Sequence, residues 1–165
     1  MSLGGEKEND RVNREYPTRP LIGTGALILQ DGKLLLIKRG GQPGQGKWSV
    51  PGGLVELGET VQNTLIREAK EEVGLDVEAI KLIDVCDSVT SDENGCIQYH
   101  FVIVEFLVRI VGGDLKPGGD ALEAKWIALD EVEKCNLANT FRRFFEKHRD
   151  ELKKLAFIGS AAKRG

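Results

Sequence analysis

Residues 53–75 read GLVELGETVQNTLIREAKEEVGL and follow the spacing G-x5-E-x7-R-E-x2-E-E-x-G. The stretch places five glutamates and one arginine between two glycines that frame it. Thr60 is suited to cap the N-terminus of a helix, and Gly74 is suited to the left-handed conformation that ends one. We therefore expect a loop followed by a helix over residues 61–73.

A helical wheel of this segment separates an apolar stripe from an acidic one. At about 100° per residue, the apolar stripe contains Val61, Leu65, Ile66, Ala69 and Val73. Glu68, Glu71 and Glu72 are three or four positions apart and share the neighbouring stripe. Because that stripe borders the apolar face, we expect the three carboxylates at the rim of a buried surface, partly shielded from water.

A divalent cation would offset the repulsion among these carboxylates, since like charges at such spacings destabilise a helix. Clustered oxygen ligands suit a hard cation such as Mg²⁺ or Mn²⁺, which bridges carboxylates to substrate phosphates. Arg67 lies four positions before Glu71 and can pair with it. Glu59 precedes the helix, where a negative charge suits the helix N-terminus. The glycines around Gly53 allow the loop to approach a ligand closely.

The spaced pattern resembles the signature box of the Nudix hydrolases, and every fixed identity of that box is present. The resemblance continues on both sides, with GKWSVPGG at residues 46–53 and EAKWI at residues 123–127 followed by Leu129-Asp130-Glu131. It covers residues 20–135. It implies fold class α/β (α+β), an alpha/beta/alpha sandwich around a mixed β-sheet.

The resemblance also implies an activity, the cleavage of a nucleoside diphosphate linked to another moiety, by attack of water on phosphorus. Carried over residue by residue, it makes Glu68, Glu71 and Glu72 the metal-binding carboxylates. Glu59 would assist through the metal shell, and Arg67 would position a glutamate. Gly53 would bring its backbone close to the metal.

The general base remains open between the box and the segment that precedes Trp126. In this family the base is a box glutamate or a carboxylate on a loop outside the box. Glu68 is the candidate inside the box. Asp120 and Glu123 are the candidates outside it.

Three aromatic residues are candidates for substrate contact. Trp48 is a core or rim aromatic in its simplest interpretation, and stacking on a nucleobase is the alternative. Tyr99 and Phe101 alternate with His100 in a strand-like run, so one face of that strand could line the substrate cleft.

The order of elements downstream of the box is most similar to the ADP-ribose pyrophosphatase branch, which releases AMP and ribose 5-phosphate. The sequence has Thr90 to Asp92 where many enzymes of that branch carry a proline. The alternative is a nucleoside triphosphate pyrophosphohydrolase that removes damaged or excess nucleotides. A non-catalytic nucleotide sensor is a third possibility, although sensors usually carry an eroded box.

Composition restricts the class of protein. With 165 residues, 30% of them charged, and a net charge of −3, the chain is expected to form one soluble domain without a basic nucleic-acid-binding surface. No apolar run approaches the length of a membrane span, and no signal peptide is visible. The three cysteines, Cys86, Cys96 and Cys135, lack metal-ligand spacing and leave one unpaired, which favours a reduced cytoplasmic protein. A homodimer is possible.

The organisation along the chain follows from turn signals. Apolar runs at 21–30 and 33–38 flank Asp31-Gly32 and predict a hairpin. Two long strands are expected at 77–89 and 97–110, and another strand at 124–129. A short helix is expected to start at Asp130, and a longer one is expected from about Ala138 to Leu155. The predicted division is a polar tail over residues 1–18, one domain over residues 19–157 and a C-terminal tail over residues 158–165.

Overall fold

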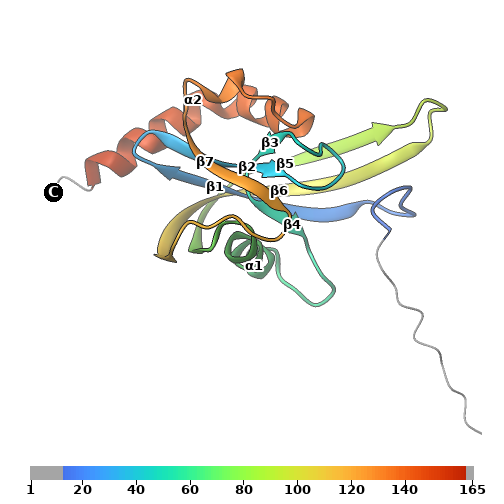
Figure 1. The fold of residues 1–165 in the computed structure, drawn as a ribbon, viewed down its shortest axis with the longest axis horizontal. Helices are drawn as coiled ribbons and strands as arrows, with labels where there is room; N and C mark the ends of the chain where they lie inside the picture. The colour runs from blue at the N-terminus through green and yellow to red at the C-terminus, as the bar shows by residue number, and fades with distance from the viewer. Residues whose placement is uncertain (1–12, 163–165) are drawn as a thin grey trace, which may run out of the picture.

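A seven-stranded mixed sheet lies between two helices in the computed structural model, which describes residues 13–162 and their side chains up to Ile158 (Figure 1). The helix α1 covers one face and α2 covers the other. The expected sandwich of a mixed sheet between helices is thus confirmed.

The strands follow the alternation of apolar residues and turn signals. Their bounds are β1 Leu21–Gln30, β2 Lys33–Arg39, β3 Trp48–Ser49, β4 Gly52–Leu54, β5 Leu75–Ser91, β6 Ile97–Gly113 and β7 Ala121–Ala128. Asp31 and Gly32 both have positive φ, of 51° and 73°, as a two-residue hairpin turn requires.

Strand β1 is the centre of the topology. It pairs in parallel with β6, which pairs antiparallel with β5. At one end, residues 23–25 of β1 pair with β4; at the other end, residues 29–30 pair with β2, which also carries β3 and β7. The box strand β4 is therefore joined directly to the central strand of the sheet.

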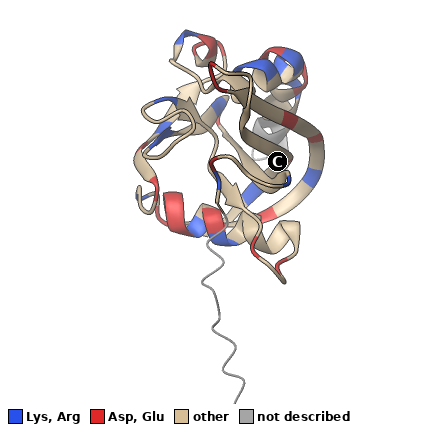
Figure 2. Ribbon diagram, turned by 90° about the vertical axis from the view of Figure 1, so that its right-hand side faces the viewer, with Lys and Arg blue, Asp and Glu red and all other residues tan. Residues whose placement is uncertain are grey.

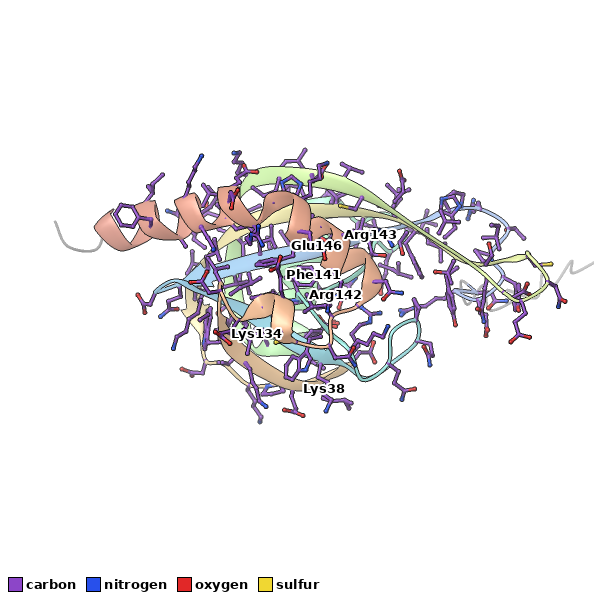
Figure 3. All side chains as sticks on the ribbon, turned by 90° about the horizontal axis from the view of Figure 1, so that it is seen from above. Lys38, Lys134, Phe141, Arg142, Arg143 and Glu146 are labelled. Carbon is purple, nitrogen blue, oxygen red and sulfur yellow. The ribbon has the colours of Figure 1, made fainter. Side chains whose placement is uncertain are left out.

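The helices bound the two faces of the sheet. Helix α1, Val61–Val73, has the predicted bounds: Thr60 Oγ1 accepts a hydrogen bond from the Asn63 amide at 3.1 Å, and Gly74 is left-handed with φ 73°. A short 3-10 helix, η1, spans Val132–Lys134, and α2 spans Asn139–Ala162 across the opposite face (Figure 3).

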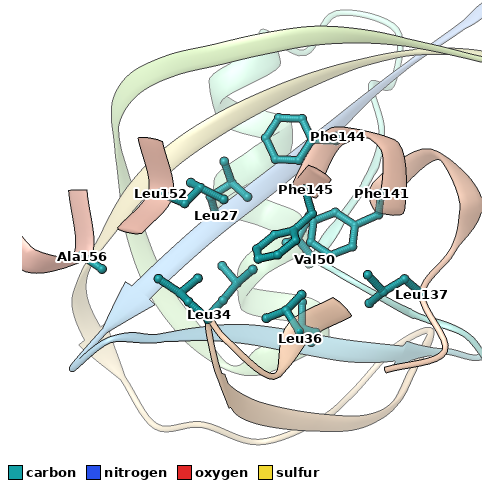
Figure 4. Close-up of a cluster of buried hydrophobic side chains, with 12 residues drawn as sticks. Leu27, Leu34, Leu36, Val50, Leu137, Phe141, Phe144, Phe145, Leu152 and Ala156 are labelled. Atoms are coloured by element: carbon teal, nitrogen blue, oxygen red, sulfur yellow. The ribbon is translucent and has the colours of Figure 1, made fainter. Parts of the chain in front are cut away.

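Two hydrophobic cores hold these layers together. One lies under α2, where Phe141, Phe144, Phe145 and Leu152 pack on Leu27 of β1 and its neighbours (Figure 4). The other lies under α1 and joins the buried residues of that helix to β1, β2 and β6. Leu107 packs in the first core and Phe106 in the second, because successive residues of a strand face opposite sides.

The hairpin of β5 and β6 extends beyond both helices (Figure 1). Residues 13–18 lie beside it: the Tyr16 amide donates to the Gln98 carbonyl at 2.8 Å, and the Tyr16 hydroxyl donates to Asp92 at 2.9 Å. This part of the predicted polar tail is thus tied to the sheet. Residues 1–12 of that tail lie outside the described residues.

Several predicted bounds are wrong. Helix α2 continues seven residues past the predicted end at Leu155 and crosses the predicted tail boundary at residue 157. No proline interrupts it, and Ala156 still packs in the core under α2. The strand predicted at 124–129 starts at Ala121, and the helix predicted from Asp130 is only the 3-10 turn η1. Residues 163–165 lie outside the described part.

Cys86, Cys96 and Cys135 are all free thiols, as the sequence predicted. Acidic and basic positions are interspersed over the described ribbon (Figure 2). Among residues 13–162, the helices are too short or too polar to cross a membrane.

Candidate active site

A cavity of about 330 Å³ opens between the box and the first turn of α2. Its floor is formed by β1 and β6, and one wall is formed by the loop at residues 40–47. Glu68 and Glu72 of α1 reach it at one side, together with Gly52 and Gly53 of β4. Its volume falls in the range of small-molecule sites.

The faces of α1 differ in part from the helical-wheel prediction. Leu65, Ala69 and Val73 are buried as predicted, but Ile66 is 42% exposed. Glu72 takes the buried position instead, with only 5% of its surface exposed. The sheet covers the side of the helix that includes Glu72. A carboxylate is therefore buried at the edge of the hydrophobic core.

Glu72 is a buried carboxylate held by a backbone donor. Its Oε2 accepts a hydrogen bond from the Gly52 amide at 2.8 Å. Burial raises its pKa to about 8, and the nearby Glu68 adds to the rise. Among the described lysines and arginines, none forms an ion pair with it. Glu72 therefore has the properties of a ligand-binding group.

Glu68 lies against the backbone of Gly53. A β-carbon at residue 53 would overlap the Glu68 carboxyl group, so the close approach requires glycine. Burial raises the pKa of Glu68, although Arg67 Nη1 donates to it at 2.8 Å and acts in the opposite sense. Both carboxylates at the cavity thus resist ionisation in the absence of a cation.

Arg67 connects the remaining box carboxylates. Its Nε donates to Glu59 at 2.7 Å, its Nη1 to Glu68 and, at 3.3 Å, to Glu71, and its Nη2 to the Leu54 carbonyl at 3.2 Å. The predicted pair with Glu71 is confirmed, and Glu59 is the closer partner. The arginine lowers the pKa of Glu59 to about 2. Glu59 and Glu71 lie outside the cavity lining, and the Glu71 side chain is 53% exposed.

The oxygen donors at this side fit a hard divalent cation. Within residues 13–162, no three acidic, histidine or cysteine side chains form a preassembled metal cage. Glu68 and Glu72 nevertheless offer two neighbouring carboxyl groups beside the backbone of Gly52 and Gly53, and a bound cation would favour the ionised form of both. A cation such as Mg²⁺, which keeps several waters and uses one or two carboxylates, suits this donor set.

The structure separates the two base candidates outside the box. Asp120 lines the cavity, because the Gly118 amide donates to the Glu72 carbonyl at 3.0 Å and docks the loop on the end of α1. Glu123 lies outside the cavity lining and is paired with Lys38 at 3.2 Å and Lys125 at 3.0 Å. These two lysines lower the pKa of Glu123.

Of the three aromatic candidates, only Phe101 lines the cavity. Tyr99 is buried beside it, with ring centroids 6.2 Å apart, but lies outside the lining. Trp48 packs against the core under α2, with Lys125 Nζ 5.3 Å from its ring centroid. Trp48 thus packs as a core or rim aromatic and lies outside the cavity lining.

Two residues that the sequence interpretation passed over also line the cavity. Arg39 is partly buried at the end of β2, where its Nε donates to the Pro43 carbonyl at 2.9 Å. Burial lowers its pKa. Glu105 is buried in β6. Its signal in the sequence was a single acid within the apolar run FVIVEFLV at residues 101–108.

Comparisons with known proteins agree with this geometry. Residues 19–148 match a family profile described as NUDIX domain. An ADP-ribose pyrophosphatase of Methanocaldococcus jannaschii is 37% identical over 128 residues, which cover 78% of this chain and 73% of that protein.

Two further proteins are similar. The crystal structure of a MutT NUDIX hydrolase from Burkholderia pseudomallei is 33% identical with a TM-score of 0.68, covering 78% of this chain and 97% of that one. An 8-oxo-dGDP phosphatase of Mus musculus is 37% identical over 98 residues, which span 57% of this chain but only 28% of that protein.

Proposed function

Because the chain belongs to the Nudix family and is a Nudix hydrolase, we propose that it is a metal-dependent pyrophosphohydrolase that cleaves ADP-ribose to AMP and ribose 5-phosphate. The relative from Methanocaldococcus jannaschii supports this choice of substrate, since it is named an ADP-ribose pyrophosphatase and covers most of both chains.

One observation carries the chemical part of the proposal. Glu68 and Glu72 face a cavity of nucleotide size, and Glu72 is buried without an ion pair to any described lysine or arginine. Burying a carboxylate in that way is costly unless a cation or donor joins it. A phosphate-bound divalent cation would be such a partner.

Glu68 and Glu72 would hold Mg²⁺ or Mn²⁺ directly, with the Gly53 backbone beside it and with Glu59 and Glu71 acting from outside the cavity. When bound, the cation would neutralise phosphate charge and lower the pKa of the attacking water. Arg67 would orient Glu68 through the 2.8 Å hydrogen bond from Nη1. A fixed carboxylate loses less conformational entropy when it binds a ligand.

Asp120 would be the general base. It lines the cavity, and the docked loop brings it to the side occupied by Glu68 and Glu72. There it would accept a proton from the water that attacks phosphorus. Glu68 is the alternative base, although metal coordination would compete for its lone pairs. Arg39 would contact the phosphates, because it is a cation on the wall of the cavity and its guanidinium forms no ion pair within the described part of the chain.

Cleavage of damaged nucleotides is the second candidate function. The similarity to the 8-oxo-dGDP phosphatase of Mus musculus, over 57% of this chain, favours it. Both functions would use the same phosphate-binding side of the cavity and would differ in the group attached to the phosphates.

A Mg²⁺-dependent hydrolysis screen tests the proposal. ADP-ribose, other nucleotide sugars, dinucleotides, nucleoside triphosphates and 8-oxo-dGDP would be compared by product analysis. Preferential release of AMP from ADP-ribose is expected. Preferential release of a nucleoside monophosphate with phosphate or pyrophosphate would favour nucleotide sanitising instead.

Compartment and assembly are also proposals. Three free thiols suit the reducing cytoplasm. A homodimer would cover apolar side chains that are about half exposed on the long hairpin, such as Leu82, Val85 and Val89. Light scattering coupled to size exclusion would report a mass twice that of the chain.

A further inference from the structure

Glu105 occupies an unusual place for an acid, in the central part of the sheet on the face covered by α2. In β6 it lies two residues before Leu107, which packs in the core under α2, so both side chains face the same side. It pairs across the sheet with Gly25 of β1. A β-carbon at residue 25 would overlap its carboxyl group, so the carboxyl lies directly over this glycine.

The Oε2 atom of Glu105 lacks a hydrogen-bond partner within the described part of the chain. Only 4% of the residue is exposed. The titratable groups that face it are Asp84 and Cys86 on β5, and neither supplies a positive charge. Asp84 is itself occupied by Lys147 and His148, each at 2.7 Å. Burial raises the pKa of Glu105 to about 7.

An unsatisfied buried acid is costly, and Glu105 lines the cavity. Each buried polar group of this kind calls for an explanation, and a ligand that donates a hydrogen bond is one. Because Glu105 belongs to the cavity lining, its carboxyl group borders whatever occupies the cavity.

The floor around Glu105 suits a flat ring. Gly23 and Gly25 present bare backbone on this face of β1, and their neighbours on β6 are Ile103 and Glu105. Phe101 continues the apolar floor. Glycine within a strand often marks the close approach of a ligand. In the sheet, Gly25 stands between Glu105 and Gly52 of the box, so this floor adjoins the phosphate side of the cavity.

We propose that Glu105 recognises the nucleobase of the substrate by accepting a hydrogen bond from the 6-amino group of adenine. The inference rests on the proposed function for the choice of adenine. A carboxyl oxygen accepts from an N–H group in either protonation state. When Glu105 is ionised, a keto oxygen at the same position would face it acceptor to acceptor and would leave it unpaired, so the discrimination is expected above the pKa of Glu105. Such a site rejects the wrong partner because its buried polar group stays unsatisfied.

Turnover of ADP-ribose and of inosine diphosphate ribose, which carries a keto group at position 6, tests the proposal. The wild-type protein should prefer ADP-ribose in kcat/KM. In Glu105→Gln, whose amide both donates and accepts, that preference should fall by about tenfold or more, with kcat for ADP-ribose within about threefold. Glu78→Gln, an exposed change on β5, is the matched control and should keep the wild-type preference.

Gly25→Ala provides a second variant, since it would displace the carboxyl group without removing it. It should lose the same preference. An unchanged preference in folded Glu105→Gln would overturn the proposal. A hundredfold fall in kcat with both substrates at constant KM would also overturn it, because it would place Glu105 at the reacting phosphate.

Binding of AMP, IMP and GMP, measured by calorimetry, separates this inference from the proposed function. If neither diphosphate ribose is cleaved, the proposed function fails, yet tighter binding of AMP than of IMP that is lost in Glu105→Gln would still support the inference. Equal binding of AMP and IMP to the wild-type protein, or tightest binding of GMP, would overturn it.

Discussion

Glu59 and Glu72 stand at opposite ends of the same loop-helix unit, and their surroundings are opposite too. Glu59 accepts hydrogen bonds from Arg67 and from the Thr64 hydroxyl at 2.8 Å, and its pKa is lowered to about 2. Glu72 is buried with one backbone donor, and its pKa is raised to about 8. The two residues have the same chemistry and differ in the partners that the fold supplies.

The partners of each acid therefore distinguish residues that keep the loop in place from residues that can bind a ligand. Glu59, which accepts from both Arg67 and Thr64, is satisfied and keeps the loop against the helix. Glu72, like Glu105, is left short of partners and faces the cavity. Unsatisfied buried groups are found where a ligand completes them, so we expect these two acids to respond to substrate or cation and Glu59 to respond mainly to Arg67.

The largest effect is expected for Glu72→Gln. The variant should fold, because the side chain keeps its shape and its acceptor for the Gly52 amide, but kcat should fall by about 10²–10³-fold. Steady-state kinetics at saturating Mg²⁺ would measure this, with the exposed change Glu146→Gln on α2 as control. Turnover near the wild-type rate in Glu72→Gln would contradict the claim that Glu72, unlike Glu59, takes part in binding the cation or substrate.

Asp120 and Glu123 offer the next test, because only one of them lines the cavity. Asp120→Asn should lower kcat by about 10²-fold if it removes the base. Glu123→Gln should stay within about twofold, since its carboxylate is bound to two lysines on the surface. Full kcat in both variants would move the base into the box, with Glu68 as the remaining candidate.

The pH dependence of stability should distinguish Glu105 from the paired acids. Its folded pKa of about 7 exceeds the unfolded value of an ordinary glutamate, so the folded state binds more protons between these values. Stability from this group is present below about pH 4.5 and is lost as the pH rises through 7, by about 2–3 kcal/mol. Denaturant unfolding of the metal-free protein from pH 5 to 8 should therefore show a shallower decline in Glu105→Gln. Glu72 changes the pH dependence of stability in the same direction in the wild-type protein and in Glu105→Gln, so its contribution cancels when the two curves are subtracted. Parallel curves would contradict the assignment.

The smallest effect is expected at the satisfied end. Arg67→Lys keeps a positive charge but loses the planar group that reaches Glu59 and Glu68 together. Metal affinity should weaken by about tenfold, as is usual for a residue that orients a ligand. Titration with Mn²⁺, followed by its paramagnetic signal, would measure it. A loss as large as that of Glu72→Gln would show that Arg67 does more than orient Glu68.

Local sequence rules were sufficient for the secondary structure around the box. Thr60 and Gly74 bound α1 at the predicted residues, and Asp31-Gly32 forms the predicted turn. These features depend on neighbours along the chain. The end of α2 was predicted too early, because the contacts of Ala156 lie in the tertiary core and are not visible in helix-end signals.

The cavity required contacts between distant segments. Asp120 and Glu123 are three residues apart and equivalent as base candidates in the sequence. In the structure Asp120 lies on a loop docked on α1 at the cavity, whereas Glu123 is paired with Lys38 and Lys125. Tyr99 and Phe101 alternate with His100 and share one face of β6, but of the two only Phe101 lines the cavity.

The sequence by itself determined the family, the box helix and the set of carboxylates available, because identity and spacing along a helix follow from the order of residues. Only the tertiary structure decided which carboxylates are neutralised and which are left unsatisfied. Burial and ion pairing depend on the strands and loops that surround each acid, and those come from parts of the chain far from it. Glu105 shows this most clearly. In the sequence it is a single acid in an apolar strand, and only the structure shows that the absence of a side chain at Gly25 leaves space for its carboxyl group beside the cavity.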